Sequence, residues 1–265
     1  MDLLTIVQDL ETRSIEGRSQ YICAFLEQQQ IGYTFHRYES GRNILVNHKS
    51  TKPLIVISSH FDVVPLSPGA NDNASAIAVC LAILNKLESY TFVNFDVAVY
   101  FFDEEEHGLR GSKAYVRDFG IDRIKALINL ELVGQGDRFA LWPVNDLSAG
   151  QVLGAFEEAA HELAVTSHRF DQIVTNSADH ISFQKAGLVD AFTITCVSES
   201  DLHVAYHYYR ALEFDVDKSV LQEIIQQAPL FQHYHKSTDL STYLSEDSLQ
   251  MTVNTIWNAL IRLDN

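Results

Sequence analysis

Apolar residues change their spacing along the first third of the chain, and each spacing predicts a different element. Helical spacing comes first and is followed by short β-rich runs. The predicted helices cover residues 2–12 and 18–31, and the predicted strands cover residues 33–38, 43–48 and 54–60. A polar loop at 64–73 then leads into a helix over 74–89 that is apolar on nearly every side. We expect this helix to be buried against a sheet.

Strands and helices alternate through most of the remaining chain. The further predicted strands cover residues 93–102, 125–133, 138–144, 168–174 and 191–198. The further predicted helices cover residues 111–120, 149–165, 179–186 and 245–263. Such alternation indicates an α/β fold, in which helices cover both faces of a largely parallel sheet. We therefore expect a single α/β domain over residues 1–265, with a mixed, mostly parallel central sheet.

Residues 199–231 interrupt this alternation. They read as two helices that carry an unusual number of aromatic side chains: His203, Tyr206, His207, Tyr208 and Tyr209. One interpretation is a lid or a wall of a substrate pocket. The other is an ordinary amphipathic helix or a contact in a homo-oligomer. The sequence leaves both open.

The overall charge narrows the classes of partner. The formal net charge is −16 and the isoelectric point is about 5.0, which argues against a nucleic acid or an anionic membrane surface. Cys23, Cys80 and Cys196 are widely spaced and lie among apolar residues, so we expect reduced thiols. The first residues show no basic leader and no signal-peptide pattern. A cytoplasmic protein without a membrane partner is the expectation.

Acidic residues and one histidine follow the ends of several predicted strands. His60 and Asp62 follow one strand, the acids Asp103 to Glu106 follow another, and Glu131 lies near the end of a third. Asp72 lies where the polar loop enters the buried helix. In parallel sheets, ligands bind beyond the carboxyl ends of the strands. These side chains are therefore expected to meet at one edge.

Negative charge pooled in this way needs a counter-charge, and a mixture of imidazole and carboxylate suits zinc. Each part also has a plainer interpretation. His60 and Asp62 could be a buried hydrogen-bonded pair, Asp72 a helix cap, and the four acids a solvated face. Glu131 is harder to explain without a partner, because its neighbours are apolar and an unpaired buried carboxylate is costly.

A second imidazole comes from residues 233–240. His233 and His235 alternate in a stretch that reads as extended, so we expect them to point to opposite sides. By itself, His235 fits a surface or core histidine as well as a ligand. Together with the acids at the strand ends, it favours a metal centre.

Five segments in order, HFD, PGANDNASA, EEHGLRGS, INLELVG and YHKSTD, resemble the motifs of the zinc aminopeptidase and glutaminyl cyclase family, whose peptidases are co-catalytic di-zinc exopeptidases. They lie between about residues 55 and 240. The resemblance implies two zinc ions, or one in cyclases. The implied ligand sets are His60, Asp72 and Glu131 for one ion, and Asp72, Glu106 and His235 for the other.

The same resemblance implies that Glu105 is the general base and that Asp62 orients His60. A register shifted by one, with Glu104 as the base and Glu105 as a ligand, is the alternative to check. At Glu131 many family members have Asp, so metal spacing or affinity could differ.

The segment SADHISFQKAGL resembles a stretch of the family near the substrate. It suggests that Asp179 and His180 line the pocket, although Asp179 fits a helix N-cap equally well. His107 could reach the same cleft or belong to a solvated turn.

The implied reaction is hydrolysis of a peptide or small amide, with removal of N-terminal residues. Acyl transfer of the glutaminyl cyclase kind and a non-catalytic binding module are the alternatives. The segment HFDVVP also matches a related peptidase family, whose members usually carry an inserted dimerisation domain. With 265 residues, the chain has little room for such an insertion.

Overall fold

The computed structural model describes residues 1–46, 51–171, 177–214 and 216–265. Its strands are β1 Thr34–Arg37, β2 Arg42–Val46, β3 Leu54–His60, β4 Asp96–Phe102, β5 Ile124–Leu130, β6 Arg138–Trp142, β7 Ser167–Arg169 and β8 Ala191–Val197. Its helices are α1 Leu3–Leu10, α2 Ile15–Gln28, α3 Ser75–Leu87, α4 Arg110–Phe119, α5 Gln151–Glu162, α6 His180–Lys185, α7 Glu199–Glu213, α8 Lys218–Ile225, α9 Pro229–Gln232 and α10 Glu246–Asp264.

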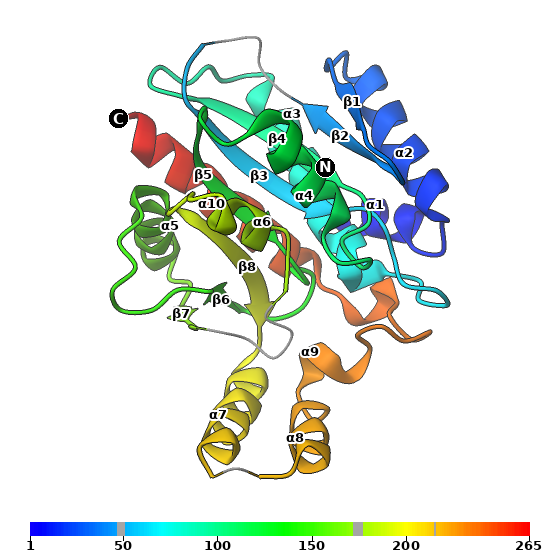
Figure 1. The fold of residues 1–265 in the computed structure, drawn as a ribbon, viewed down its shortest axis with the longest axis vertical. Helices are drawn as coiled ribbons and strands as arrows, with labels where there is room; N and C mark the ends of the chain where they lie inside the picture. The colour runs from blue at the N-terminus through cyan, green and yellow to red at the C-terminus, as the bar shows by residue number, and fades with distance from the viewer. Residues whose placement is uncertain (47–50, 172–176, 215) are drawn as a thin grey trace.

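Within the described residues the strands form one eight-stranded sheet in the order β1-β2-β4-β3-β5-β8-β6-β7 (Figure 1). Its centre, β4-β3-β5-β8, is parallel. β1 and β2 add an antiparallel edge on one side, and β6 runs antiparallel to β8 on the other. The predicted fold class, a mixed and mostly parallel sheet in an α/β domain, is confirmed.

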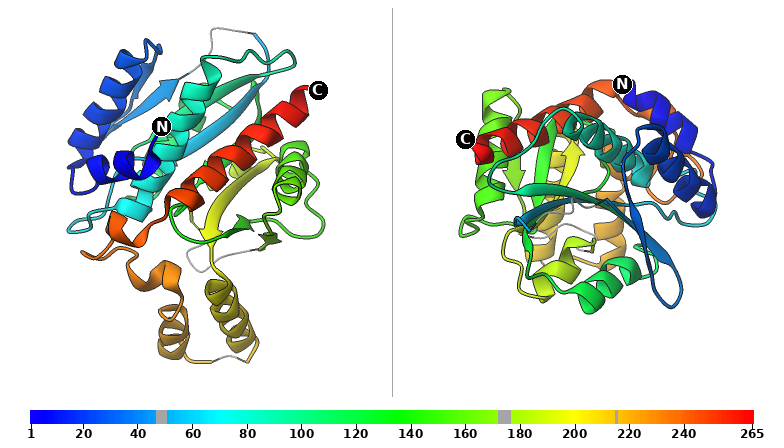
Figure 2. Two further views of the ribbon diagram at one scale, coloured as in Figure 1. Left: turned by 180° about the vertical axis from the view of Figure 1, so that it is seen from behind. Right: turned by 90° about the horizontal axis from the view of Figure 1, so that it is seen from above.

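Helices cover both faces of the sheet, as the view from above makes plain (Figure 2). Alternate residues of β4 enter opposite layers, because successive strand side chains point to opposite faces. Val97, Val99 and Phe101 join the larger core with α1, α3, α5 and α10. Tyr100 and Phe102 join the smaller core, where Tyr115 of α4 and Phe183 of α6 pack. The parallel strands consequently have apolar side chains on both faces.

A serine hydroxyl caps the start of α2, whereas α4 starts without a side-chain cap. α2 begins three residues before the predicted start, because the Ser14 hydroxyl accepts a hydrogen bond from Gly17 N at 3.1 Å. α4 begins at Arg110, so Ser112, a residue type that often caps helices, lies inside the helix and does not cap it. The hydroxyl of Ser112 lies 2.8 Å from that of Ser182 instead. The predicted stop at Gly120 is confirmed by its positive φ of 67°.

Some strands are shorter than expected. The strand predicted over 125–133 ends at Leu130, which leaves Glu131 in the connection beyond it. The strand predicted over 168–174 is found at Ser167–Arg169, and its residues 172–174 lie outside the described part of the chain. Residues 47 and 48 of the strand predicted over 43–48 also lie outside it.

α7 and α8 project from the carboxyl end of the sheet as a helical hairpin (Figure 1). The two helices predicted for this region are present, and the short α9 follows them. α7 starts at a capping box in which Ser198 and Asp201 each accept a hydrogen bond from the other's backbone N–H. Across the described helices, none has both the length and the apolar character that crossing a bilayer requires.

Candidate metal centre

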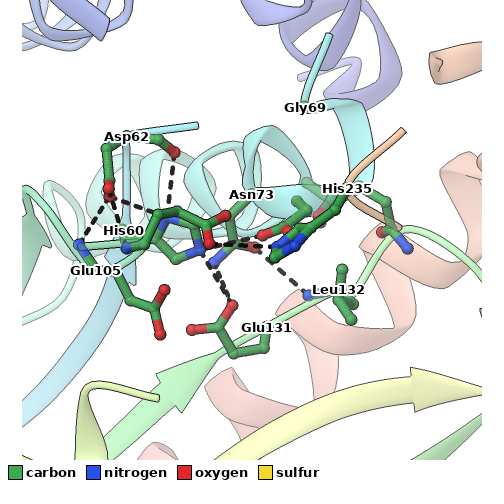
Figure 3. Close-up of polar contacts among 12 residues, drawn as sticks. His60, Asp62, Gly69, Asn73, Glu105, Glu131, Leu132 and His235 are labelled. Atoms are coloured by element: carbon green, nitrogen blue, oxygen red, sulfur yellow. Dashed lines mark hydrogen bonds and ion pairs between the residues drawn. The ribbon is translucent and has the colours of Figure 1, made fainter. Parts of the chain in front are cut away.

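The ends of three parallel strands deliver the predicted acids and His60 to one place. His60 is the last residue of β3, Glu105 and Glu106 lie in the turn after β4, and Glu131 follows β5. The side chains of His60, Glu105 and Glu131 lie together in the close-up (Figure 3). His60 and Glu131 are buried. These residues therefore lie together beyond the carboxyl ends of the strands, as expected.

Asp72 and Glu131 contact the imidazole of His60 from the same side. His60 Nε2 lies 3.2 Å from Asp72 Oδ1 and 3.3 Å from Glu131 Oε2. These three atoms form the first of the two predicted ligand groups.

His235 completes the second group, and Asp72 is shared between both. His235 Nε2 lies 3.1 Å from Asp72 Oδ2 and 3.2 Å from Glu106 Oε2. Each oxygen of the Asp72 carboxylate thus faces a different histidine. His60, Asp72 and Glu106 also offer ligand atoms that all lie within 4.8 Å of one another.

Asp62 connects His60 with the adjacent glutamates. Its Oδ1 lies 3.2 Å from His60 Nδ1 and accepts a hydrogen bond from Glu105 N at 3.0 Å. Its Oδ2 accepts a hydrogen bond from Glu106 N at 3.1 Å. One buried carboxylate therefore orients the imidazole and fixes the turn that carries both glutamates.

The shifted register of the acids is not supported by the geometry. Glu104 turns away from the centre, where its carboxylate accepts a hydrogen bond from the Ser40 hydroxyl at 2.5 Å. Arg110 Nη1 lies 3.4 Å from the other oxygen of Glu104. Of the four consecutive acids, Glu105 and Glu106 line the pocket that also contains His60 and Asp72.

Burial and contacts with neighbouring charged groups shift the pKa values of His60, Asp72 and Glu105. Burial acts to lower the pKa of His60, but the carboxylates of Glu131, Asp62 and Asp72 raise it well above its ordinary value. Burial acts to raise the pKa of Asp72, and hydrogen bonds with His235 and His60 bring it below its usual range. For Glu105, burial raises the pKa well above that of a solvated glutamate.

Three polar residues, Asp239, Asn73 and Asn129, make hydrogen bonds that hold the candidate ligands in place. Asp239 accepts hydrogen bonds from Asn71 N at 2.8 Å and Asp72 N at 3.1 Å. Glu131 accepts hydrogen bonds from Asn73 Nδ2 at 2.9 Å and Asn129 Nδ2 at 3.1 Å. In the sequence, such residues can be recognised as polar residues among apolar neighbours, as Asn129 is within a buried strand.

The helix-cap interpretation of Asp72 and the extended conformation predicted around His233 and His235 are both wrong. α3 begins at Ser75, with Ala74 as its cap residue, so Asp72 does not cap it. His235 lies in a turn with φ of 58°, not in an extended stretch. The two histidines nevertheless separate, because His233 stacks on Tyr243 with ring centroids 3.9 Å apart.

Asp179 and His180 are both buried next to this site. Asp179 occupies the N-cap position of α6, as one interpretation expected, but its side chain makes no capping hydrogen bond. Neither of its carboxylate oxygens has a hydrogen-bond partner, and burial raises its pKa to about 7. His180 Nδ1 lies 2.6 Å from Thr193 Oγ1, and burial lowers the pKa of this imidazole to about 3. His107 is half exposed, with Nδ1 3.9 Å from Asp62 Oδ2.

The donor set fits a metal ion such as zinc. Ligand bonds of 2.0–2.1 Å in a tetrahedron place neighbouring ligand atoms about 3.3–3.4 Å apart. The four imidazole-to-carboxylate separations, between 3.1 and 3.3 Å, are close to that spacing. Glu106 Oε1 is buried without a hydrogen-bond partner, which is costly unless a cation satisfies it.

The sequence model described as Peptidase family M28 matches residues 43–260. A vacuolar membrane protease of Candida glabrata is 27% identical over 86% of this chain and 21% of its own length. Aminopeptidase YwaD of Bacillus subtilis is 33% identical over 52% of this chain and 31% of its own length. The chain thus spans a third or less of the length of these two relatives.

Solved structures show the same fold at low sequence identity. Porphyromonas gingivalis glutaminyl cyclase aligns with a TM-score of 0.75 and 17% identity, covering 99% of this chain and 97% of that chain. The zinc aminopeptidase BSAP of Bacillus subtilis aligns with a TM-score of 0.63 and 22% identity, covering 84% of this chain and 50% of that chain.

Proposed function

Because the chain belongs to peptidase family M28, we propose that it is a zinc-dependent peptidase that removes N-terminal residues from peptides or small amides. One observation carries the proposal. The two oxygens of the buried Asp72 face two imidazoles, and each imidazole also faces a further carboxylate. A shared carboxylate between two such groups is what a pair of closely spaced metal ions requires.

His60, Asp72 and Glu131 would hold one zinc ion, and Asp72, Glu106 and His235 would hold the other. Two ions per chain are proposed, and a single ion would match the cyclase variant of the site. Bound zinc polarises the substrate carbonyl and lowers the pKa of the attacking water.

Glu105 is the proposed general base. Its backbone is fixed by Asp62, and its raised pKa suits a group that takes a proton from water and returns it to the leaving amine. Asp62 orients His60 through Nδ1, so that Nε2 is directed at the metal position. Asp179 and His180 are proposed to border the bound substrate.

A cytoplasmic location stays a prediction from the sequence. Relatives that match most of this chain are named vacuolar membrane proteases, and that name describes those longer proteins. A peptide or small amide is the proposed partner, and a homo-oligomer stays open.

Acyl transfer of the glutaminyl cyclase kind is the second candidate. The structural alignment with a glutaminyl cyclase favours this reaction, because it covers 99% of this chain and 97% of the other. The alignment supports a shared fold. In that reaction a substrate amine replaces water as the nucleophile. The third possibility, a binding module without activity, is disfavoured because Glu105 and all five proposed ligands are present together.

The deciding experiment is a product analysis with the zinc-loaded protein. Aminoacyl amides, N-blocked peptides and peptides with N-terminal Gln are incubated separately and resolved by mass spectrometry. We expect free amino acids from the unblocked substrates and no reaction with the blocked peptides. A cyclised product from the Gln peptides would favour the second candidate and contradict the first.

A further inference from the structure

A buried arginine lies beside the segment that carries Asp72. Arg18 belongs to α2 and is fully buried. Among the residues that the structure describes, it is the only lysine or arginine with a buried side chain. Burial of a guanidinium is costly unless hydrogen bonds and opposite charges compensate for the lost water. The contacts that supply this compensation indicate what Arg18 does.

The guanidinium of Arg18 holds the two residues that precede this segment. Its Nη2 donates hydrogen bonds to the carbonyl oxygens of Pro68 at 2.7 Å and Gly69 at 2.8 Å. Gly69, which is labelled in Figure 3, has a φ of 66°, a left-handed conformation that favours glycine. A Cβ atom at this position would also collide with Arg18 Nη2. Glycine therefore allows the backbone to approach the guanidinium this closely.

Asp239 holds the other side of the same segment. Its carbonyl oxygen accepts a hydrogen bond from Ala70 N at 3.3 Å. Its carboxylate accepts hydrogen bonds from Asn71 N and Asp72 N. Residues 68–72 are thus fixed from α2 on one side and from Asp239 on the other. This double attachment sets the direction of the Asp72 carboxylate, because the backbone at Asp72 is not helical and has no helical hydrogen-bond pattern to hold it.

The positive charge of Arg18 acts on three acids of the centre. Burial lowers the pKa of Arg18 from 12.5 to about 10, and the charges of Asp72, Asp239 and Asp62 oppose that shift. The guanidinium therefore stays protonated at neutral pH. Within the described chain, Nε and Nη1 of Arg18 have no hydrogen-bond partner. The hydrogen bonds of Arg18 thus go to the backbone carbonyls and not to a carboxylate.

A buried cation can act on a metal site in two opposite ways. As a charge it repels Zn²⁺, so its removal would strengthen zinc binding. As a hydrogen-bond donor it fixes the backbone that carries a ligand, so its removal would weaken zinc binding. The contacts favour the second effect, because both carbonyl oxygens belong to residues that closely precede Asp72 in the chain.

We propose that Arg18 is a positioning residue of the metal centre, which preforms the place of Asp72 by holding the carbonyl oxygens of Pro68 and Gly69. This inference rests on the proposed zinc site. An outer partner of a metal ligand typically contributes 10–100-fold in metal affinity or activity, and a loss of that size is expected when Arg18 is replaced. Lysine is not equivalent, because its ammonium is a compact point charge without the fixed geometry of a guanidinium.

Zinc affinity distinguishes the two effects. Arg18→Met removes the charge and both hydrogen bonds, whereas Arg18→Lys keeps the charge. Competition with a zinc chelator should show binding at least about tenfold weaker in Arg18→Met and at least about threefold weaker in Arg18→Lys. The matched control is Leu26→Ala, which removes a buried apolar side chain from the same helix about two turns further along. It should keep the wild-type affinity.

Unchanged or tighter zinc binding in Arg18→Met would overturn the proposal, and so would an equal loss of affinity in Leu26→Ala. If Arg18→Met does not fold, Arg18→Lys decides alone, because an unchanged affinity in that variant contradicts a role of the two hydrogen bonds.

Hydrogen exchange of the metal-free protein measures the positioning without zinc. In Arg18→Lys, the amides of residues 70–74 should exchange at least about tenfold faster than in the wild type, while those of β8 keep their protection. Unchanged exchange at residues 70–74, or equal acceleration in β8, would contradict the proposal.

The two measurements separate this proposal from the proposed function. A wild type that binds no zinc would contradict the peptidase proposal, and hydrogen exchange would still test whether Arg18 fixes the segment of Asp72. Zinc binding by the wild type with the same affinity in both Arg18 variants would contradict the role of Arg18 alone.

Discussion

The candidate metal centre and the α7–α8 hairpin differ in burial and in the kind of contacts that their residues make. At the metal centre, His60, Asp62 and Asp72 are almost completely buried and make several polar contacts with one another. On the hairpin, Tyr206 and Phe214 are mostly exposed, and α7 packs mainly against α8 and α9. The first region has little freedom to vary without losing the site. The second can vary with little effect on the sheet.

The two regions are nevertheless joined at one point. Asp201 of α7 holds Leu230 of α9, and α9 directly precedes the turn that carries His235. A residue of the hairpin therefore helps to position one of the proposed ligands. Single substitutions in each region can show how far the two regions act separately.

The largest effect is expected from Glu105→Gln. Removing the proposed general base should lower kcat about 10²–10⁴-fold, because a positioned acid–base group contributes that much. Zinc content should stay at the wild-type value, since Glu105 is not among the proposed ligands. Steady-state kinetics and metal analysis of the same preparation check both parts. Activity within about tenfold of the wild type would show that another group acts as the base.

Asp239→Asn should weaken the site without removing a ligand. Asp239 orients the backbone that carries Asp72, and loss of such an outer partner typically costs 10–100-fold in metal affinity or activity. Competition with a zinc chelator measures the affinity. The matched control is Asp217→Asn, at an exposed position before α8, which should leave the affinity unchanged. Equal effects of the two substitutions would contradict the contrast between the regions.

The buried His180 should make the metal-free protein sensitive to acid. Its pKa is lowered by burial to about 3 from an ordinary 6.5, so below pH 6.5 the unfolded chain binds a proton that the folded chain does not. The free energy of unfolding should fall as the pH drops from about 6 to 4, with this residue contributing up to about 1.4 kcal/mol per pH unit.

His180→Gln should therefore reduce that slope, as measured by urea unfolding in the presence of a chelator. His161→Gln, at an exposed position of α5, serves as the control. This variant should keep the wild-type dependence of the free energy of unfolding on pH. A slope that is identical in wild type and His180→Gln would show that this imidazole is not held neutral.

The smallest effect is expected on the outer side of the hairpin. Tyr206→Ser should change the free energy of unfolding by no more than about 0.5 kcal/mol, because the side chain is exposed. Size-exclusion chromatography gives the decisive measurement for the alternative interpretation. A shift to a smaller species would assign this face to a contact between copies of the chain.

The positions of the acids were predictable because they follow from strand periodicity. Buried strands end where their apolar runs end, so the order of apolar and polar residues places His60 at the end of β3 and Glu131 near the end of β5. The sharing of Asp72 and the division between Glu105 and Glu106 came from resemblance to the family. The structure brings these residues together as expected.

The supporting residues could not be predicted in the same way. Asp239 and Asn73 act through hydrogen bonds in irregular turns, where no period relates sequence position to direction. Asp179 was a helix-cap candidate from the sequence, and it stands at the N-cap position of α6, but its side chain makes no capping hydrogen bond. An apolar pocket lies where α7, α8 and α9 meet β6 and β8, and such packing is decided by the tertiary structure.

The central claim is that one buried aspartate is shared by two metal ions, and anomalous diffraction at the zinc absorption edge tests it most directly. Crystals of the zinc-loaded protein should show two peaks, one on either side of Asp72. One peak should lie next to His60 and Glu131, and the other next to Glu106 and His235. A single peak, or peaks away from Asp72, would contradict the account.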